Sequence, residues 1–276
     1  MTATAPINAT AGLCRLPQFR PVALKLLKLV SNEDVEFGDI AKLLASDPAF
    51  SAEILAMANS PLYATSCPTT SLTRAIVMLG LERTRSLTLT VAMQAFVANV
   101  QMTPELQSSW RHSLACALTA EILAPLYRLS GDHGYTAGLM HDLGRLGLMK
   151  AYPGTYATLL RNPFDSAARM LEAERALFEM DHCQAGALLT RSWGFPAEFQ
   201  AVTEGHHSSR FGREQGVVGL TAAACSLSEA LGFQSVRCSF PDGIEEIVGS
   251  LPGSPRLDLE DLRERIAERL QSVDLK

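Results

Sequence analysis

The chain has 276 residues, of which 47% are hydrophobic, 19% charged and 7% aromatic, a composition that excludes disordered and fibrous proteins. Its formal net charge of −5 at pH 7 gives no general attraction for nucleic acid or an anionic membrane, so we expect no DNA partner. Residues 1–13 contain neither Lys nor Arg, and no stretch reaches the roughly 20 apolar residues of a membrane span.

The cysteines are scattered and form no C-x-x-C pair, which argues against a zinc or redox motif built from cysteine. We therefore expect reduced thiols, no membrane span and a location in the cytoplasm. The six positions are Cys14, Cys67, Cys116, Cys183, Cys225 and Cys238.

Helix signals follow one another along the chain and predict an all-α fold. After an amphipathic helix over residues 15–28 and a helix over residues 39–45, Asp47-Pro48 places a capping side chain before a proline at the first helical position. Ser71 opens a helix that we expect to stop at Gly80, followed by a run that reaches Val100, and Thr103-Pro104 repeats the capping pattern. The later expected helices cover residues 135–149, 166–180, 181–192, 196–206, 217–231 and 257–270. Period-two alternation is lacking, so we expect no strand.

The expected architecture is a helical bundle in which an N-terminal half packs on a C-terminal half. We expect residues 1–12 to be a flexible N-terminus, residues 13–103 the N-terminal helical half and residues 104–210 the second half. Residues 211–238 form an expected closing helix. Residues 239–276 are expected to form a loop, marked by two Pro- and Gly-containing tetrapeptides, and a short charged helix.

Three of the six histidines stand at the expected ends of helices. His141-Asp142 follows an apolar segment that contains glycine, and burying this dyad is costly unless a metal or a close partner satisfies it. His112 lies mid-helix, His182 follows Asp181 at a helix start, and His206-His207 closes a helix. His133 is expected to be a turn or capping residue.

Facing helices build metal sites from inward side chains, and these histidines with Asp142 are expected to converge in that way. Neutral imidazole and carboxylate suit iron, manganese or zinc, so a divalent transition metal is the expected cofactor. The simpler alternative is that these residues are hydrogen-bonded polar groups of the core with no ion bound.

Two blocks of sequence resemble the HDOD (HD-related output domain) group of the HD superfamily, over about residues 13–210. The first block is Pro21–Leu27, Ile40–Leu44, Asp47–Phe50, Ala58–Pro61 and Arg74–Gly80. The second is His112, His141–Arg145, Asp181–Ala187, Trp193–Pro196 and His206-His207. The resemblance implies an all-α fold with an HDOD half and an HD-like half, and a signalling or regulatory role in bacteria.

Enzymes related to this group include HD-GYP cyclic-dinucleotide phosphodiesterases, and the resemblance implies a metal-ligand set by position. The matching residues are His112, His141, Asp142, His182, His206 and His207. The enzymes carry a further aspartate ligand on a later helix, but its best match, residues 221–224, holds no carboxylate. The G-Y-P-containing loop is also absent. Arg145 replaces the lysine of H-D-x-G-K and is expected to bind phosphate.

The lost carboxylate and the N-terminal block favour a regulatory module without catalysis, which acts in trans on signalling proteins and retains a metal. A metal-dependent phosphohydrolase or cyclic-dinucleotide phosphodiesterase is the first alternative, with a nucleotide or cyclic dinucleotide as its ligand. The second alternative is a sensor of a ligand, a metal or a redox state. The sequence therefore does not decide whether the protein is an enzyme, and the lost carboxylate favours the absence of activity.

Overall fold

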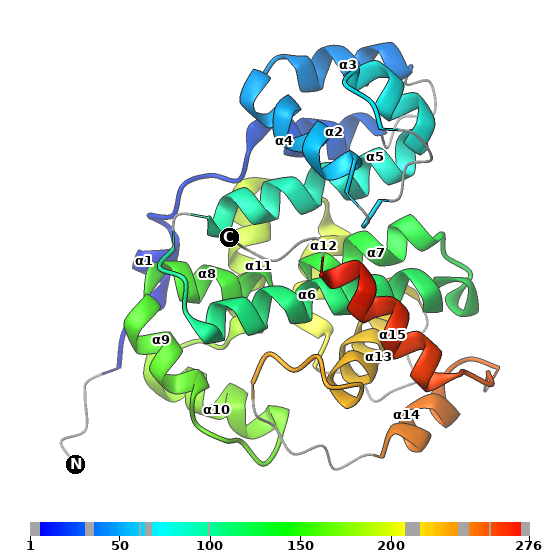
Figure 1. Cartoon of the computed structure of the whole chain (residues 1–276). Coiled ribbons are helices and arrows are strands. Elements are labelled where there is room, and N and C mark those ends of the chain that lie inside the picture. Colours follow the sequence, from blue (N-terminus) through cyan, green and yellow to red (C-terminus); the bar gives the residue numbers. More distant parts are fainter. Residues whose placement is uncertain are drawn as a thin grey trace. The chain divides into compact units, whose positions relative to one another are not determined.

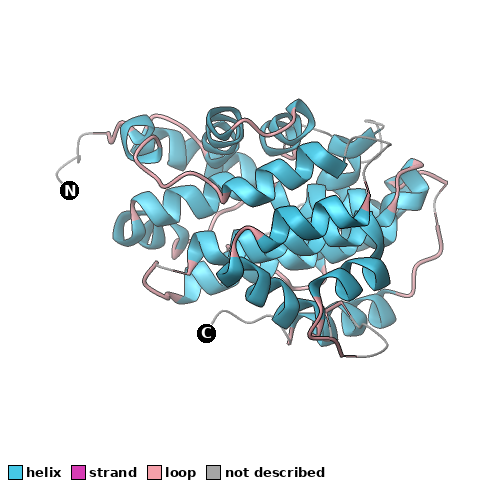
Figure 2. Cartoon of the chain, turned by 90° about the horizontal axis from the view of Figure 1, so that it is seen from above, coloured by secondary structure: helices cyan, strands magenta, loops and turns pink. Residues whose placement is uncertain are grey.

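The computed structural model describes residues 6–30, 36–60, 62–63, 68–98, 100–207, 216–236, 243–253 and 255–271. Helices dominate this part of the chain and no strand occurs in it, which confirms the all-α prediction (Figure 2). None of the helices in the described ranges is long and apolar enough to cross a membrane.

The chain divides into two compact units. One unit comprises Met1–Pro17 and Val100–Arg263, and the other comprises Gln18–Asn99 and Glu264–Lys276. Helix α15, Leu259–Leu270, contributes residues to both units.

The unit built from residues 18–99 contains four helices labelled in Figure 1: α2 (Pro21–Val30), α3 (Phe37–Ala45), α4 (Pro48–Ala58) and α5 (Leu72–Val97). Asp47 caps α4, since its Oδ1 accepts from the backbone N–H of Phe50 at 3.0 Å. Its other oxygen pairs with Arg20 at 3.2 Å, so one carboxylate fixes both the helix start and a neighbouring segment. Gly80 has φ 77° and ψ 172°, which interrupts α5 where the sequence predicts a stop.

The other unit holds the predicted site. Its helices are α1 (Ala9–Leu13), α6 (Pro104–Leu123), η1 (Ala124–Tyr127), α7 (Gly131–Met140), α8 (Leu143–Ala151), α9 (Pro153–Leu160), α10 (Ala167–Phe178), α11 (His182–Trp193), α12 (Ala197–Gly205), α13 (Gly216–Ala230) and α14 (Ile244–Ser250). Side-chain caps begin several of them, including Thr103 at α6 and Asp181 at α11. Helix α6 packs against α7 and α13, and α11 packs against α8 and α12 (Figure 1).

Three expectations about these helices were wrong. The single helix expected over residues 135–149 is two helices, because Asp142 leaves helical geometry at φ −98° and ψ 20°. Helix α1 lies partly in the terminus expected to be flexible, and its Ala9 and Leu13 are buried. Helix α14 lies within the expected loop of residues 239–255, where Ile247 supplies a buried apolar anchor.

The two helices that flank the site approach each other through glycine. A Cβ on Gly144 of α8 would collide with the carbonyl oxygen of His182 and the amide nitrogen of Gly186. Both obstacles are backbone atoms of α11 or its start, which cannot rotate away. This contact therefore sets the distance between α8 and α11, and with it the position of the His141-Asp142 turn.

We predict that Gly144→Ala lowers the free energy of unfolding by about 1–3 kcal/mol, because an added methyl overpacks a backbone contact. Gly154→Ala is the matched control, since nothing lies within 4 Å of the added methyl in α9. There, alanine is expected to be neutral or to stabilise by up to about 1 kcal/mol. Urea unfolding followed by circular dichroism measures both, and equal stabilities would contradict the close approach.

Candidate metal centre

The structure gathers most of the predicted ligands into one buried cluster. His112 comes from α6, His141 and Asp142 from the turn between α7 and α8, His182 from the start of α11, and His206 from the end of α12. Each of these residues is at most 3% exposed. These side chains are named the buried cluster below.

His207 lies at the edge of the buried cluster. Its ring centroid is 4.3 Å from that of His206 and 5.1 Å from that of His182. The residue is less completely buried than its neighbours. Its assignment as a ligand stays a prediction.

Backbone carbonyl groups fix the rings of His112 and His141. Nδ1 of His112 lies 2.7 Å from the carbonyl oxygen of Phe233, and Nδ1 of His141 lies 2.6 Å from that of Gly138. A carbonyl oxygen can only accept, so each Nδ1 carries the hydrogen. Each neutral ring then presents a lone pair at Nε2.

The same arrangement orients His182 and His206. Nδ1 of His182 lies 2.7 Å from Oε2 of Glu174, and Nδ1 of His206 lies 3.1 Å from the carbonyl oxygen of Thr203. All four rings thus hold their Nδ1 atoms on acceptors and turn Nε2 toward the cluster. Partners of this kind orient the imidazole ligands of protein metal sites.

The inward nitrogens of His112, His141 and His206 meet no nitrogen or oxygen donor. Nε2 of His112 and Nε2 of His141 face each other at 3.2 Å. Burial lowers the pKa of both rings, so an added proton between them is disfavoured. Nε2 of His206 and Oδ1 of Asp142 have no hydrogen-bond partner. Four buried acceptors therefore converge on a space that needs a positive centre.

Donor spacing fits a metal ion. Two ligand atoms about 2.0–2.3 Å from a metal, at a tetrahedral angle, lie about 3.3–3.7 Å apart. Oδ1 of Asp142 lies 3.4 Å from Nε2 of His182 and 3.6 Å from Nε2 of His206. His141, Asp142 and His206 each offer a donor atom within 4.8 Å of the others. The imidazole and carboxylate set suits iron, manganese or zinc.

Arg145 is buried beside the cluster. Its Nε donates to Oδ2 of Asp142 at 2.8 Å, its Nη2 lies 3.2 Å from Nε2 of His182, and its Nη1 lies 3.7 Å from Oε1 of Glu174. Burial opposes charge on Asp142, but Arg145 and the histidines hold its pKa well below the usual range. The guanidinium is thus engaged by groups of this chain. A phosphate-binding role for Arg145 stays a prediction.

Sequence reasoning missed Glu174 of α10. This carboxylate is fully buried and accepts from Nδ1 and the backbone N–H of His182 and from the hydroxyl of Tyr156. A signal was available, because Met170, Glu174 and Phe178 recur at four-residue spacing and form the buried face of α10. An acid in an apolar stripe requires buried partners.

Two further residues of α13 were also missed. Cys225 places its Sγ 3.6 Å from Nε2 of His112, and it directly follows the tract 221–224 in which the last carboxylate was sought. Glu229, one turn further, has its pKa raised to about 7 by burial. Helix α13 therefore brings both a thiol and a carboxyl group toward the cluster.

His133 and Asp181 make their contacts outside the buried cluster. His133 lies in the first turn of α7, where its ring faces a carboxylate oxygen of Glu198 at 3.3 Å. Asp181 caps α11 and pairs with Arg175 at 2.6 Å. Neither is part of the buried cluster.

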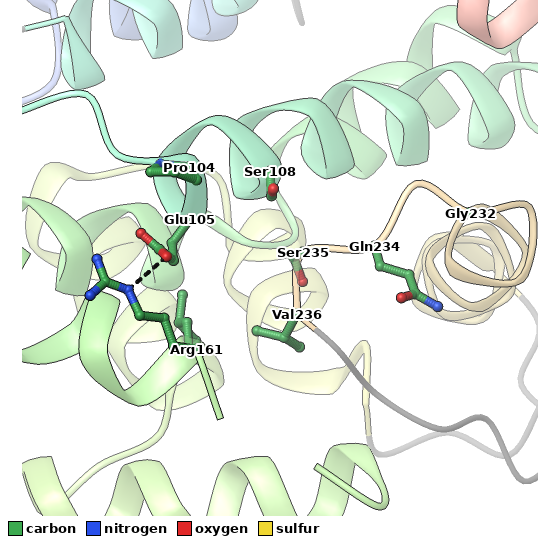
Figure 3. A pocket seen from close by; sticks show the side chains of 9 residues that line it. Pro104, Glu105, Ser108, Arg161, Gly232, Gln234, Ser235 and Val236 are labelled. Atoms are coloured by element: carbon green, nitrogen blue, oxygen red, sulfur yellow. Dashed lines mark hydrogen bonds and ion pairs between the residues drawn. The ribbon is translucent and has the colours of Figure 1, made fainter. Parts of the chain in front are cut away.

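A surface pocket of about 520 Å³ lies at the start of α6 (Figure 3). Its wall includes Glu105, which accepts from Arg161 at 2.9 Å, and Ser235 from the segment after α13. Phe233, whose carbonyl fixes His112, belongs to the same segment, 232–236. The pocket wall is thus connected by one hydrogen bond to the buried cluster.

Comparisons with known proteins identify a family and several structures that are similar to this chain. The family described as the HDOD domain matches residues 16–209. The structure of an HDOD domain protein with unknown function from Geobacter sulfurreducens has a TM-score of 0.75 and 24% identity, and covers 96% of this chain and 94% of that chain. A structure from Shewanella amazonensis SB2B with the provisional name of phosphohydrolase has a TM-score of 0.68 and 24% identity, over 96% and 97% of the two chains.

Two other comparisons are consistent with this fold. A structure from Marinobacter aquaeolei VT8 with the provisional name of signal transduction protein has a TM-score of 0.65 and 19% identity, over 98% of this chain and 65% of that chain. An uncharacterized protein of Treponema pallidum (strain Nichols) is 23% identical over 265 residues. The chain spans 49% of the length of that relative.

We predict that Arg145→Met destabilises the metal-free protein by about 3–5 kcal/mol, because Asp142 and Glu174 lose a buried partner. Arg169→Met is the control, since the ion pair of Arg169 with Glu172 is exposed and is expected to contribute under about 1 kcal/mol. Urea unfolding at neutral pH compares the two variants. Similar losses would show that the Arg145 pairs contribute no more than a surface ion pair.

We also predict a pH-dependent effect of Glu229→Gln. The raised pKa of Glu229 means that its contribution to stability is complete below about 4.5 and is lost as pH rises through about 7. Glutamine removes this loss, so the variant should gain on the wild type between pH 5 and pH 8, by at most about 3 kcal/mol.

Thermal unfolding of metal-free protein across this pH range measures the effect. Glu204→Gln, on the exposed face of α12, is the control and should show no such trend. A constant difference between Glu229→Gln and the wild type at every pH would contradict the raised pKa of Glu229.

Proposed function

The chain belongs to the HDOD domain family, and on this basis we propose that it is a bacterial regulatory module that acts in trans on signalling proteins. We propose that its buried cluster holds a divalent transition metal, iron, manganese or zinc, without catalysing hydrolysis. The proposal places the protein in the cytoplasm.

The convergence of acceptors that meet no nitrogen or oxygen donor carries the metal assignment. His112 and His141 direct their Nε2 atoms at each other, and His206 and Asp142 add two acceptors without donors. Of the candidate ligands, these four would hold the ion, with His182 and His207 at the margin. A bound metal supplies Lewis-acid charge at this position and links α6, the α7–α8 turn and the end of α12.

Burial supports a regulatory role over a hydrolytic one. A hydrolytic metal keeps a coordination position open to water and substrate. Here the ligand residues are at most 3% exposed, and Arg145 is engaged by Asp142, His182 and Glu174 instead of facing solvent. The name of the Marinobacter structure, a signal transduction protein, agrees with this assignment.

A metal-dependent phosphohydrolase is the second candidate. The donor spacing that suits a metal also suits a hydrolytic centre, and the Shewanella structure bears the provisional name of phosphohydrolase. In that case Arg145 would contact the phosphate of a nucleotide or cyclic dinucleotide. The two candidates differ in whether the metal-loaded protein turns over phosphoesters.

We predict that protein purified without added metal contains about one transition-metal ion per chain by inductively coupled plasma mass spectrometry. His141→Ala should lose this ion, because it removes an inward Nε2. His133→Ala is the control, since His133 pairs with Glu198 outside the cluster, and it should retain the ion. Absence of metal from the wild type, after loading has also been attempted, would refute the metal assignment.

The same preparations test catalysis. The metal-loaded wild type should hydrolyse phosphomonoesters, nucleotides and cyclic dinucleotides at the same background rate as His141→Ala, which lacks the ion. A rate in the wild type that His141→Ala abolishes and His133→Ala keeps would overturn the regulatory assignment in favour of the phosphohydrolase.

A further inference from the structure

Cys225 of α13 directly follows the tract 221–224, where the resemblance implies a ligand that this chain lacks. We propose that the thiolate of Cys225 binds the metal together with His112 and His141. The inference rests on the metal centre proposed above and adds a ligand to it.

The geometry of three donor atoms carries the proposal. Sγ of Cys225 lies 3.6 Å from Nε2 of His112, which itself lies 3.2 Å from Nε2 of His141. All three donors lie within 4.8 Å of one another. Metal–sulfur and metal–nitrogen bonds of about 2.3 and 2.0 Å at a tetrahedral angle place S and N about 3.5 Å apart. The observed spacing is therefore that of two ligands of one ion.

The packing of helices in the interior fixes the position of Cys225. Helix α13 packs against α6, which carries His112, and Cys225 is 2% exposed. Thr119 of α6 and Ser228 of α13 share a buried hydrogen bond of 2.8 Å, which fixes the register of the two helices near the thiol. The neighbouring tract 221–224 offers no other strong ligand, because it consists of one threonine and three alanines.

A thiolate changes which metals the site prefers. Sulfur is a soft ligand that favours zinc, cobalt(II) and iron(II) over magnesium and manganese. With the imidazoles of His112, His141 and His206 and the Asp142 carboxylate, Cys225 would bring the donors from this chain to five. The site then belongs to the sulfur-containing class and not to the carboxylate-rich class that the resemblance implies.

Cobalt(II) substitution tests the proposal, because a cobalt–thiolate bond gives a charge-transfer absorption band in the near ultraviolet. Metal-free full-length protein is titrated with cobalt(II), and bound cobalt is counted by mass spectrometry. The wild type should bind about one ion and show the band. Cys225→Ser should lose the band and bind cobalt at least about tenfold more weakly.

Cys183→Ser is the matched control. Its Sγ lies 3.7 Å from Nε2 of His182, so this cysteine is as close to an imidazole as Cys225 is, and it is also buried. Cys183→Ser should keep the band. A band that survives Cys225→Ser, or bound cobalt without a band in the wild type, would overturn the thiolate ligand while leaving the metal centre intact.

Failure of the wild type to bind cobalt or zinc at all would instead refute the metal centre itself. If Cys225→Ser does not fold, as judged by circular dichroism, Cys225→Asp supplies the second variant. It should bind cobalt without the sulfur band and shift the preference toward manganese by about tenfold or more. An unchanged preference and an unchanged band in Cys225→Asp would contradict the proposal.

Discussion

The site depends on the hydrogen bond that each imidazole ring makes through its Nδ1 atom, on the side away from the cluster. Carbonyl oxygens of Phe233, Gly138 and Thr203 accept from three of the rings, and the carboxylate of Glu174 accepts from the fourth. Because an acceptor on one side leaves a lone pair on the other, the fold selects one tautomer for the rings of His112, His141 and His206, whose pKa values are lowered by burial. Burial also opposes charge on His182, but Glu174 helps to hold the pKa of that ring well above its usual value. Four helices thus converge on a space rich in electron pairs and poor in protons, and a cation satisfies that imbalance.

The buried ion pairs next to this space keep it organised before any metal arrives. Arg145 links Asp142, from the α7–α8 turn, to Glu174 of α10, and Glu174 holds His182 at the start of α11. Such pairs contribute little net stability relative to apolar packing, but they allow few alternative arrangements. The ligands are therefore preorganised, and metal binding does not have to order them.

Much of this organisation is accessible from sequence. Capping at Asp47 and Thr103 and the spacing of apolar residues predict the helical fold, because these signals are local. The histidines are found because a polar dyad in an apolar, glycine-containing segment needs a buried partner. The break of the helix at Asp142 was not predicted, because no proline marks it and Asp142 stands at the N-cap of α8 without making a side-chain capping hydrogen bond.

The remaining site residues depend on tertiary contacts. Glu174 becomes a partner of His182 only because the turn between α10 and α11 brings the start of α11 back to it, and Cys225 approaches His112 only because α13 packs on α6 in one register. The motif in the sequence therefore indicates a lost carboxylate at residues 221–224, whereas Cys225, the next residue, places a sulfur atom in that region. Pairings between distant segments are the part of the site that no local pattern encodes.

The hydrogen bond between His112 and Phe233 connects the interior to the molecular surface. The segment that carries the Phe233 carbonyl also lines the pocket beside Glu105 and Arg161, so the two places share one short stretch of backbone. A molecule that bound in that pocket and moved the segment would remove the acceptor that fixes the His112 tautomer. With the proton on Nε2, the ring would no longer offer a lone pair to an ion at that atom. In this way, a ligand in the surface pocket would lower the affinity of the buried cluster for a metal ion.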